Sequence, residues 1–185
     1  MQELPLPAHE STFRQPSEDD YRAQVKMLLD KAVPIVNKVE VVVFLQEAVR
    51  EYNDAKERLT SLGICQVLCT ILRTVHDEEL LRQSLNFAIA LCRHEDATDV
   101  LVQQHALVSC VGSILDRYPI DTLSLASLDL HRQMALVIAR ACETTSVIRK
   151  RLVADGANDL VEMLKKSDSE TVRSAANMAL MRIAP

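Results

Sequence analysis

The sequence predicts an all-α protein built as a row of similar helical units. One pattern occurs three times: a helical segment that begins near Gly63, Ala106 or Gly156 is followed by a longer helical segment. Glycine is scarce, with three residues in 185, and tryptophan is absent, whereas Ala, Leu, Arg, Glu and Gln are plentiful. These five residue types favour helices. Repetition at this period indicates units that bury their apolar faces only against one another, as in an α-solenoid.

The first 19 residues are expected to form an extended, acidic tail. They contain Pro5, Pro7 and Pro16 and show no helical period. Residues 1–20 hold five acidic side chains and one basic side chain, so most of the formal net charge of −5 lies there. We expect this tail to dock on the protein itself or on a partner.

Residues 20–185 are expected to form the repeat domain, which begins with a degenerate cap or partial repeat over residues 20–52. A serine followed by three acidic residues indicates the start of a helix, which we expect over residues 21–31. Pro34 ends this element. Residues 39–52 include three consecutive valines that favour a strand, but their apolar side chains keep helical spacing, so a helix is expected there.

Three repeats are expected to follow, over residues 53–94, 95–143 and 144–185. Each is predicted to contain one short and two longer helices: 54–60, 63–74 and 77–93 in the first, 97–104, 107–117 and 127–142 in the second, and 145–154, 157–166 and 169–183 in the third. The second repeat is longer than the others because of an inserted loop over residues 118–126. Such a loop is either a binding element or a tolerated surface excursion.

The middle helices of the three repeats share one apolar face. The positions four, five and eight residues after each turn are apolar in every copy: Val67, Leu68, Ile71, Cys110, Val111, Ile114, Leu160, Val161 and Leu164. This spacing predicts one buried face on each helix. Gly63 and Gly156 stand at the turns themselves, where a left-handed residue costs little only for glycine.

These residues resemble armadillo repeats, with HEAT repeats as the close alternative. The resemblance is strongest in LVADGANDLVEMLKKSDSETVRSAANMAL, residues 152–180, and covers about residues 53–185. The short helix and sharp glycine turn before each middle helix favour armadillo repeats. The resemblance implies a right-handed superhelix and a role in binding other proteins.

One part of the armadillo pattern is missing. The family's best-known peptide receptors grip an extended peptide with a tryptophan and, four residues later, an asparagine on each third helix. The tryptophan positions correspond here to Phe87, Leu136 and Met178, and the asparagine positions to Leu91, Arg140 and Arg182. The resemblance therefore does not extend to peptide capture in the manner of nuclear-import receptors.

The third helices are expected to carry the partner-binding surface. The residues predicted to face a partner are Gln83, Phe87, Leu91, Arg132, Leu136, Arg140, Ser174, Met178 and Arg182. Exposed together, they would form a mixed apolar and basic groove suited to an acidic amphipathic segment. The alternative is that the three apolar side chains at the tryptophan positions fill the core and the arginines are only solvated. The inserted loop offers a second candidate site in Tyr118, Pro119 and Asp121.

The sequence predicts no catalytic, cofactor-binding or metal site. Three glycines cannot form a phosphate-binding loop, and no nucleotide-binding or hydrolase motif is present. The five cysteines, an odd number within apolar helical pattern, are expected to be buried thiols in a reducing compartment. Cys65 and Cys69 are spaced as two ligands, but no second Cys/His pair with finger spacing accompanies them.

The same composition excludes several partners. Outside the acidic tail the chain is close to neutral, and its six aromatic side chains are scattered, so a nucleic-acid partner is not expected. The uninterrupted apolar runs, such as residues 41–45, are all too short to insert in a membrane. The only basic cluster, Arg149, Lys150 and Arg151, is either a site for phosphate or an acidic partner or a solvated helix face.

These observations predict a non-enzymatic scaffold or adaptor for other proteins. We expect a structural subunit of a larger complex, for example a cytoskeletal or axonemal one. We expect a cytoplasmic location. Association with the cytoskeleton or a cilium is left open, and so is a nuclear location. The alternative is a regulator or co-chaperone that binds a folded GTPase or ATPase through the concave face.

Overall fold

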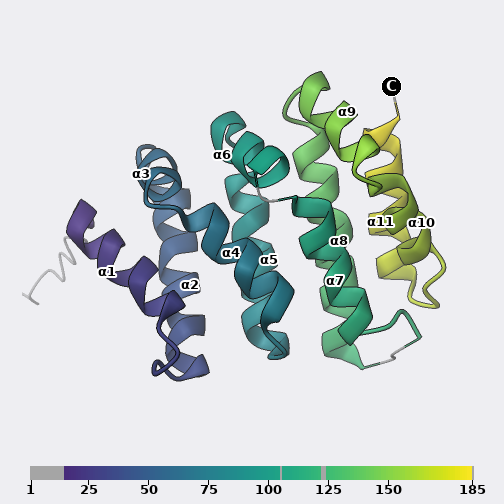
Figure 1. Cartoon of the computed structure of the whole chain (residues 1–185). Helices are drawn as coiled ribbons and strands as arrows, with labels where there is room; N and C mark the ends of the chain where they lie inside the picture. The colour runs from purple at the N-terminus through teal and green to yellow at the C-terminus, as the bar shows by residue number, and fades with distance from the viewer. Residues whose placement is uncertain (1–14, 105, 122–123, 185) are drawn as a thin grey trace, which may run out of the picture.

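The computed structural model describes residues 15–104, 106–121 and 124–184, and these residues fold entirely into helices and their connections (Figure 1). The described part contains no strand. The helices are α1 (Glu18–Leu29), α2 (Ile35–Glu51), α3 (Ala55–Ser61), α4 (Ile64–Thr74), α5 (Glu78–Leu91), α6 (Glu95–Asp99), a π-helical turn η1 (Val100–Gln104), α7 (Leu107–Arg117), α8 (Leu125–Cys142), α9 (Ser146–Ala154), α10 (Ala157–Lys165) and α11 (Glu170–Ile183). The predicted all-α solenoid is confirmed.

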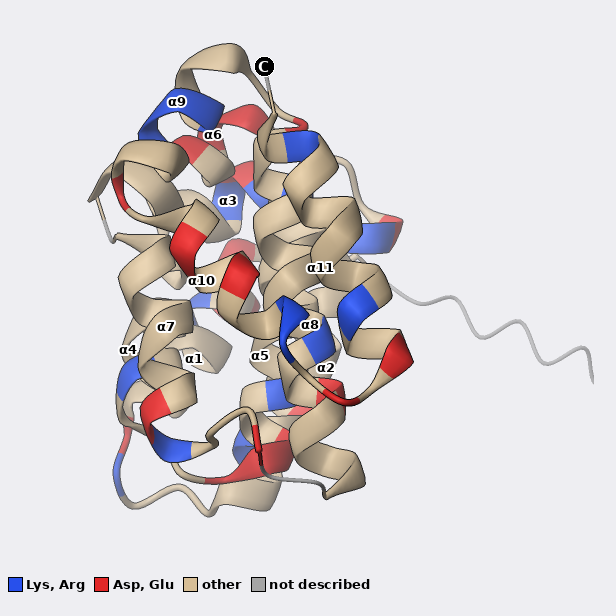
Figure 2. Cartoon of the chain, turned by 90° about the vertical axis from the view of Figure 1, so that its right-hand side faces the viewer, with Lys and Arg blue, Asp and Glu red and all other residues tan. Residues whose placement is uncertain are grey.

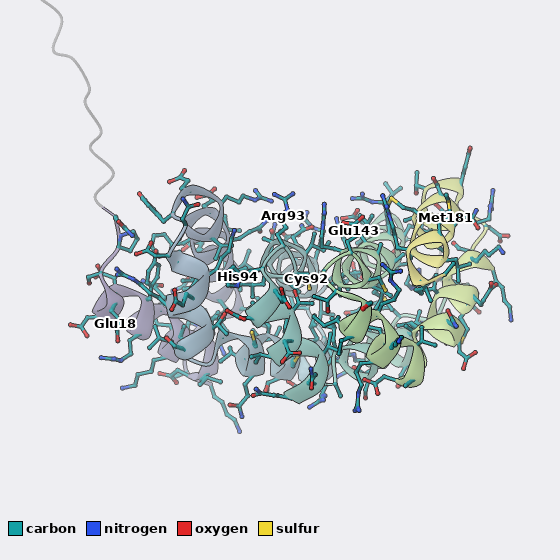
Figure 3. The ribbon with its side chains drawn as sticks, turned by 90° about the horizontal axis from the view of Figure 1, so that it is seen from above. Glu18, Cys92, Arg93, His94, Glu143 and Met181 are labelled. Carbon is teal, nitrogen blue, oxygen red and sulfur yellow. The ribbon has the colours of Figure 1, made fainter. Side chains whose placement is uncertain are left out.

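The helices are arranged in two parallel rows. One row contains α2, α5, α8 and α11, each packed against the next, and the other contains α1, α4, α7 and α10 (Figures 1 and 3). The short helices α3, α6 and α9 lie one after another along one edge of the stack, above the other helices in Figure 1. The chain therefore advances along the stack from α1 to α11, and each layer contacts mainly the layers beside it.

Apolar burial joins these layers into one core. All nine positions of the predicted apolar face on α4, α7 and α10 are buried, as the sequence predicts. The helix α8, which lies between α5 and α11, has the longest set of buried residues, including Leu130, Met134, Val137 and Ile138. A helix with neighbours on both sides must be apolar around most of its circumference. All five cysteines are buried thiols, again as predicted.

The first helix begins earlier than expected. Ser17 is its N-cap: the Ser17 hydroxyl accepts a hydrogen bond from the Asp20 amide at 3.2 Å, and the Asp20 carboxylate accepts one from the Ser17 amide at 2.8 Å. This capping box places Glu18 and Asp19 in the first helical turn, where the helix dipole favours carboxylates. The prediction that the tail extends to residue 19 is therefore wrong by two residues, and residues 1–14 of that tail lie outside the described part.

Two other boundaries differ from the sequence prediction. The inserted loop ends before residue 125, because Ser124 caps α8 by accepting a hydrogen bond from the Ser127 amide at 3.0 Å. The short helix expected over residues 97–104 is instead α6 followed by η1, and α6 begins with the acidic first turn of Glu95 and Asp96. The wider π-helical turn has no signature in the sequence.

The turns into α4, α7 and α10 all require left-handed backbone. Gly63 has φ +81°, Gly156 has φ +93°, and Ala106, at the equivalent position before α7, has φ +51°. Glycine adopts this conformation freely, whereas a residue with a Cβ atom is strained there by about 1–2 kcal/mol. The middle turn thus retains the geometry of the other two at a conformational cost.

Arg117, at the end of α7, connects two layers. Its guanidinium donates hydrogen bonds to the carbonyl oxygens of Arg73 and Val75, each at 2.8 Å, and to that of Leu72. These carbonyls stand at the C-terminal end of α4, where the helix has no backbone donors left to satisfy them. A cation at this end also complements the helix dipole. Arg117 therefore caps a helix of the preceding layer.

The turns give a test of backbone strain. Replacing Ala106 with glycine should stabilise the protein by about 0.5–1 kcal/mol, and replacing Gly63 or Gly156 with alanine should destabilise it by about 1 kcal/mol. No atom lies within 4 Å of a Cβ placed at either glycine, so steric clash does not contribute. Gly112, inside α7, is the control, because its alanine variant should be more stable through helix propensity alone. Denaturant unfolding measures all four variants, and equal effects at Gly63 and Gly112 would contradict a role for backbone strain at the turns.

Arg117 should contribute measurably to stability. Changing it to methionine keeps the aliphatic stem and removes the donors, and should lower the free energy of unfolding by about 1–2 kcal/mol. Arg22→Met is the matched control, because Arg22 is exposed and pairs only with Glu18 and Asp19 of its own helix. If the link between α7 and α4 were unimportant, thermal or denaturant unfolding would show that the two variants lose comparable amounts of stability.

Candidate functional site

The predicted partner-binding surface is divided by the structure. Phe87 and Leu91 of α5 are both 0% exposed. The prediction that they face a partner is wrong, because α2 and α8 cover α5 from both sides. Gln83 is only half-buried, and its side-chain amide donates a hydrogen bond to Glu79 of the same helix at 2.9 Å.

The predicted residues of α8 and α11 do lie together. Arg132 and Leu136 of α8 and Ser174 and Met178 of α11 line one hollow of about 420 Å³, together with Glu170, Thr171 and Ala175. We call it the α8–α11 groove. Leu136 and Ala175 provide apolar floor, and Met178 is 39% exposed at its edge. The groove joins two layers of the stack.

A second hollow extends this surface along α11. Among its lining residues are Ser174 and Met178, which also line the groove, and Asn177 and Met181, which do not. Met181 is 77% exposed, an unusual position for a large apolar side chain. Neither Asn177 nor Met181 is among the residues predicted from the sequence, although their spacing from Ser174 and Met178 places them on the same side of the helix.

The predicted arginines are paired with carboxylates that were not among the predicted site residues. Glu143 accepts hydrogen bonds from Arg140 Nη1 at 2.6 Å and pairs with Arg182 Nε at 3.0 Å, so one carboxylate connects α8 with α11. We call these three residues the Glu143 cluster. Arg132 pairs with Asp129 one turn earlier, at 2.8 Å. The i, i+3 spacing within α8 was readable in the sequence, whereas the contact with Arg182 is tertiary.

Positive charge is in excess around the Glu143 cluster. Arg93, which is exposed, lines the same hollow as Arg140, Glu143 and Glu95. Arg93 and Glu143 follow the C-terminal ends of the neighbouring helices α5 and α8, and Figure 3 labels both in the middle part of the row. Ion pairs this exposed contribute about 0–1 kcal/mol each, so a carboxylate from outside can replace Glu143 at little cost.

The candidate loop is anchored at its base. The Tyr118 hydroxyl donates to the His76 carbonyl, and the ring packs half-buried against the core. The buried His131 side chain lies 2.7 Å from the Tyr118 carbonyl through Nε2, which must donate because the carbonyl only accepts. Tyr118 therefore holds the loop in place, while Pro119 and Asp121 are exposed. Residues 122 and 123 of this loop lie outside the described part.

Burial makes three of the five thiols unreactive at neutral pH. Burial raises the pKa of Cys65 and Cys142 to about 11 and that of Cys92 to about 12, so these thiols remain protonated at neutral pH. Among the described residues, no group of three or more His, Cys, Asp or Glu side chains is arranged to hold a metal ion. None of the described helices combines the length and the apolar character that a bilayer span requires.

Comparison with known proteins identifies the fold. No family model and no curated protein matches the sequence. Solved structures do match: a designed armadillo repeat protein in complex with the peptide (KR)4 has 17% identity and a TM-score of 0.73, over 92% of this chain and 70% of that one. Two engineered proteins solved by the Northeast Structural Genomics Consortium match over 89% of this chain, with 17% and 19% identity and TM-scores of 0.73 and 0.72.

These likenesses support an armadillo-like repeat fold. The chain spans 62% and 37% of the length of the two engineered proteins. At this level of identity the similarity shows the architecture alone, which is typical of non-enzymatic binding scaffolds and does not identify a partner.

His131 gives the loop region a defined pH dependence. Burial lowers the pKa of His131 below its ordinary value of 6.5, whereas the hydrogen bond to Tyr118 partly opposes this. Protonation therefore favours the unfolded chain, and stability is lost as the pH falls through about 6.5 and below. The free energy of unfolding, measured by denaturation between about pH 7.5 and pH 5, should decrease less in His131→Gln than in the wild type.

The exposed His76 supplies the control for that measurement. His76→Gln leaves the His131 ring in place and should keep the pH dependence of the wild type. If His131→Gln and the wild type lost stability in parallel over this range, the buried imidazole would not be its source.

Proposed function

We propose that this armadillo-like solenoid is a non-enzymatic adaptor that holds a partner protein on the face formed by α8 and α11. The observation that carries the proposal is the α8–α11 groove, which has an apolar floor and is lined by Arg132. The Glu143 cluster, with Arg140 of α8 and Arg182 of α11, lies one helical turn farther along the same two helices. Exposed apolar surface beside charged groups on a repeat protein is characteristic of an interaction site.

The chemistry of this face favours an acidic amphipathic segment as the partner. Apolar side chains of such a segment would contact Leu136, Met178 and Met181, and methionine adapts readily to different shapes. Its carboxylates would reach Arg140 and Arg182, whose guanidinium groups bind carboxylates through paired hydrogen bonds. The segment would take the place of Glu143 as the bridge between α8 and α11.

We infer further that the protein acts as a subunit of a larger cytoplasmic assembly. Large apolar side chains such as Val36 and Met181 are exposed on its surface, which favours coverage by partners. A cytoskeletal or axonemal complex fits this role. Affinity purification of the full chain at native salt followed by mass spectrometry should return a complex of several proteins, whereas a single stoichiometric GTPase or ATPase would support a regulator instead.

Charge reversal on this face should weaken partner binding. The defined probe is a set of peptides selected from a random display library on the wild-type protein, which should be rich in Asp and Glu interspersed with apolar residues. Arg140→Glu combined with Arg182→Glu should weaken binding of these peptides by about tenfold or more, as judged by fluorescence titration. Arg22→Glu combined with Lys26→Glu on α1 changes the charge equally and should leave binding unchanged.

Removing the competing carboxylate should have the opposite effect. Glu143→Gln frees both arginines and should tighten binding of the same peptides by about twofold to fivefold. Selection of basic peptides, or equal affinity for wild type, the Arg140 and Arg182 double variant and Glu143→Gln, would contradict the proposed site.

A further inference from the structure

The C-terminal end of the stack carries an apolar groove with a basic edge. A hollow of about 690 Å³ lies between α9, α10 and α11, and Val153, Leu180 and Ile183 line it. Arg149 and Lys150 of α9 stand at its edge. We call it the C-terminal groove, and Figure 2, which looks onto this end, shows a Lys/Arg-coloured stretch of the α9 ribbon. The groove shares no residue with the α8–α11 groove.

The N-terminal end carries an apolar stripe with acidic residues. Val36 and Phe44 of α2 are 64% and 38% exposed, and Glu40, Glu47 and Glu51 are exposed at helical spacing beside them. We call these five residues the α2 stripe. The opposite face of α2 packs on α5. The stripe therefore points away from the stack.

Each end of the stack exposes one side of the contact between layers that is repeated inside it. Inside the stack, α5 and α8 each have a neighbouring helix of the same row on both sides, whereas α2 and α11 have one on a single side among the described residues. Apolar side chains that a neighbour would cover are consequently exposed at both ends: Val36 and Phe44 at one, Val153 at the other. Covering them with another layer would bury them as in the interior.

Charge decides which ends can meet. Residues 15–52 carry seven acidic and five basic side chains, whereas residues 144–184 carry seven basic and five acidic side chains. Two N-terminal ends or two C-terminal ends would bring like charges together, which is unfavourable across an interface. An N-terminal end and a C-terminal end attract each other. The occupant that matches the C-terminal groove in both apolar character and charge is therefore the α2 stripe of a second copy.

We propose that copies of this protein associate head to tail, with the α2 stripe of one copy in the C-terminal groove of the next. Such an interface uses two different surfaces, so each copy retains one free end and the assembly continues beyond a dimer. Because this contact and the proposed partner site use separate residues, either can fail without the other.

The first test is the mass of the full chain in solution. Sedimentation equilibrium over a wide concentration series should show an average mass that rises past that of a dimer, and added salt should weaken the association. A constant monomer mass at all concentrations would overturn the proposal. A mass that levels off at a dimer would overturn it too, because a closed symmetric interface would then be present.

Charge variants test the orientation. Glu47→Lys and Lys150→Glu should each lower the association constant about threefold or more, because each brings like charges together at the contact. Mixing the two variants should restore association, since the altered stripe of one then meets the altered groove of the other. Asp116→Lys on α7 and Arg73→Glu on α4, both exposed in the middle layers, make the same charge changes and should have no effect on the mass.

Two further measurements test whether the variants misfold, and whether the N-terminal tail rather than the α2 stripe occupies the C-terminal groove. Circular dichroism of each variant should match the wild type, because Glu47 and Lys150 are exposed. Deletion of residues 1–14 should leave the association unchanged. Loss of association on that deletion would show that the N-terminal tail occupies the groove, and would overturn the assignment to the α2 stripe. Failure of the mixed charge variants to associate would overturn that assignment too.

Discussion

The structure depends on the burial of each helix by its neighbours in the stack. No helix of the described part has a core of its own: α8 is buried because α5 lies on one side and α11 on the other, and α4 is buried against α5 and α7. The apolar spacing on each helix is therefore a requirement of the layer beside it. Stability, the shape of the binding face and the exposed ends all follow from this one dependence.

Two local features keep successive layers in register. The left-handed residues Gly63, Ala106 and Gly156 turn each short helix sharply into the next helix, so every layer begins with the same geometry. Arg117 then joins α7 to the end of α4 by satisfying carbonyl groups that the helix leaves without donors. Backbone conformation thus sets the direction of three successive layers, and a side chain joins one of them to the layer before it.

The same stacking determines which side chains are exposed and can contact a partner. Phe87, Leu136 and Met178 occupy equivalent positions in the three repeats that the sequence predicts, yet Phe87 is fully buried, Leu136 is half-buried and Met178 is exposed. Phe87 differs from Met178 because α5 is covered from both sides, whereas α11 has a row neighbour only on the α8 side among the described residues. The proposed function consequently rests on α8 and α11, where Glu143 holds two arginines ready for exchange with a partner carboxylate.

The sequence by itself determined the helical class, the nine buried positions on α4, α7 and α10 and the turns at Gly63 and Gly156, because helical spacing and glycine conformation are local properties. It also placed Arg132, Leu136, Ser174 and Met178 on one surface. Only the tertiary structure showed that Phe87 and Leu91 are covered, that Glu143 pairs with Arg182, and that Arg117 caps α4. Those facts depend on contacts between residues far apart in the chain, and no pattern within a single helix records which neighbour covers it.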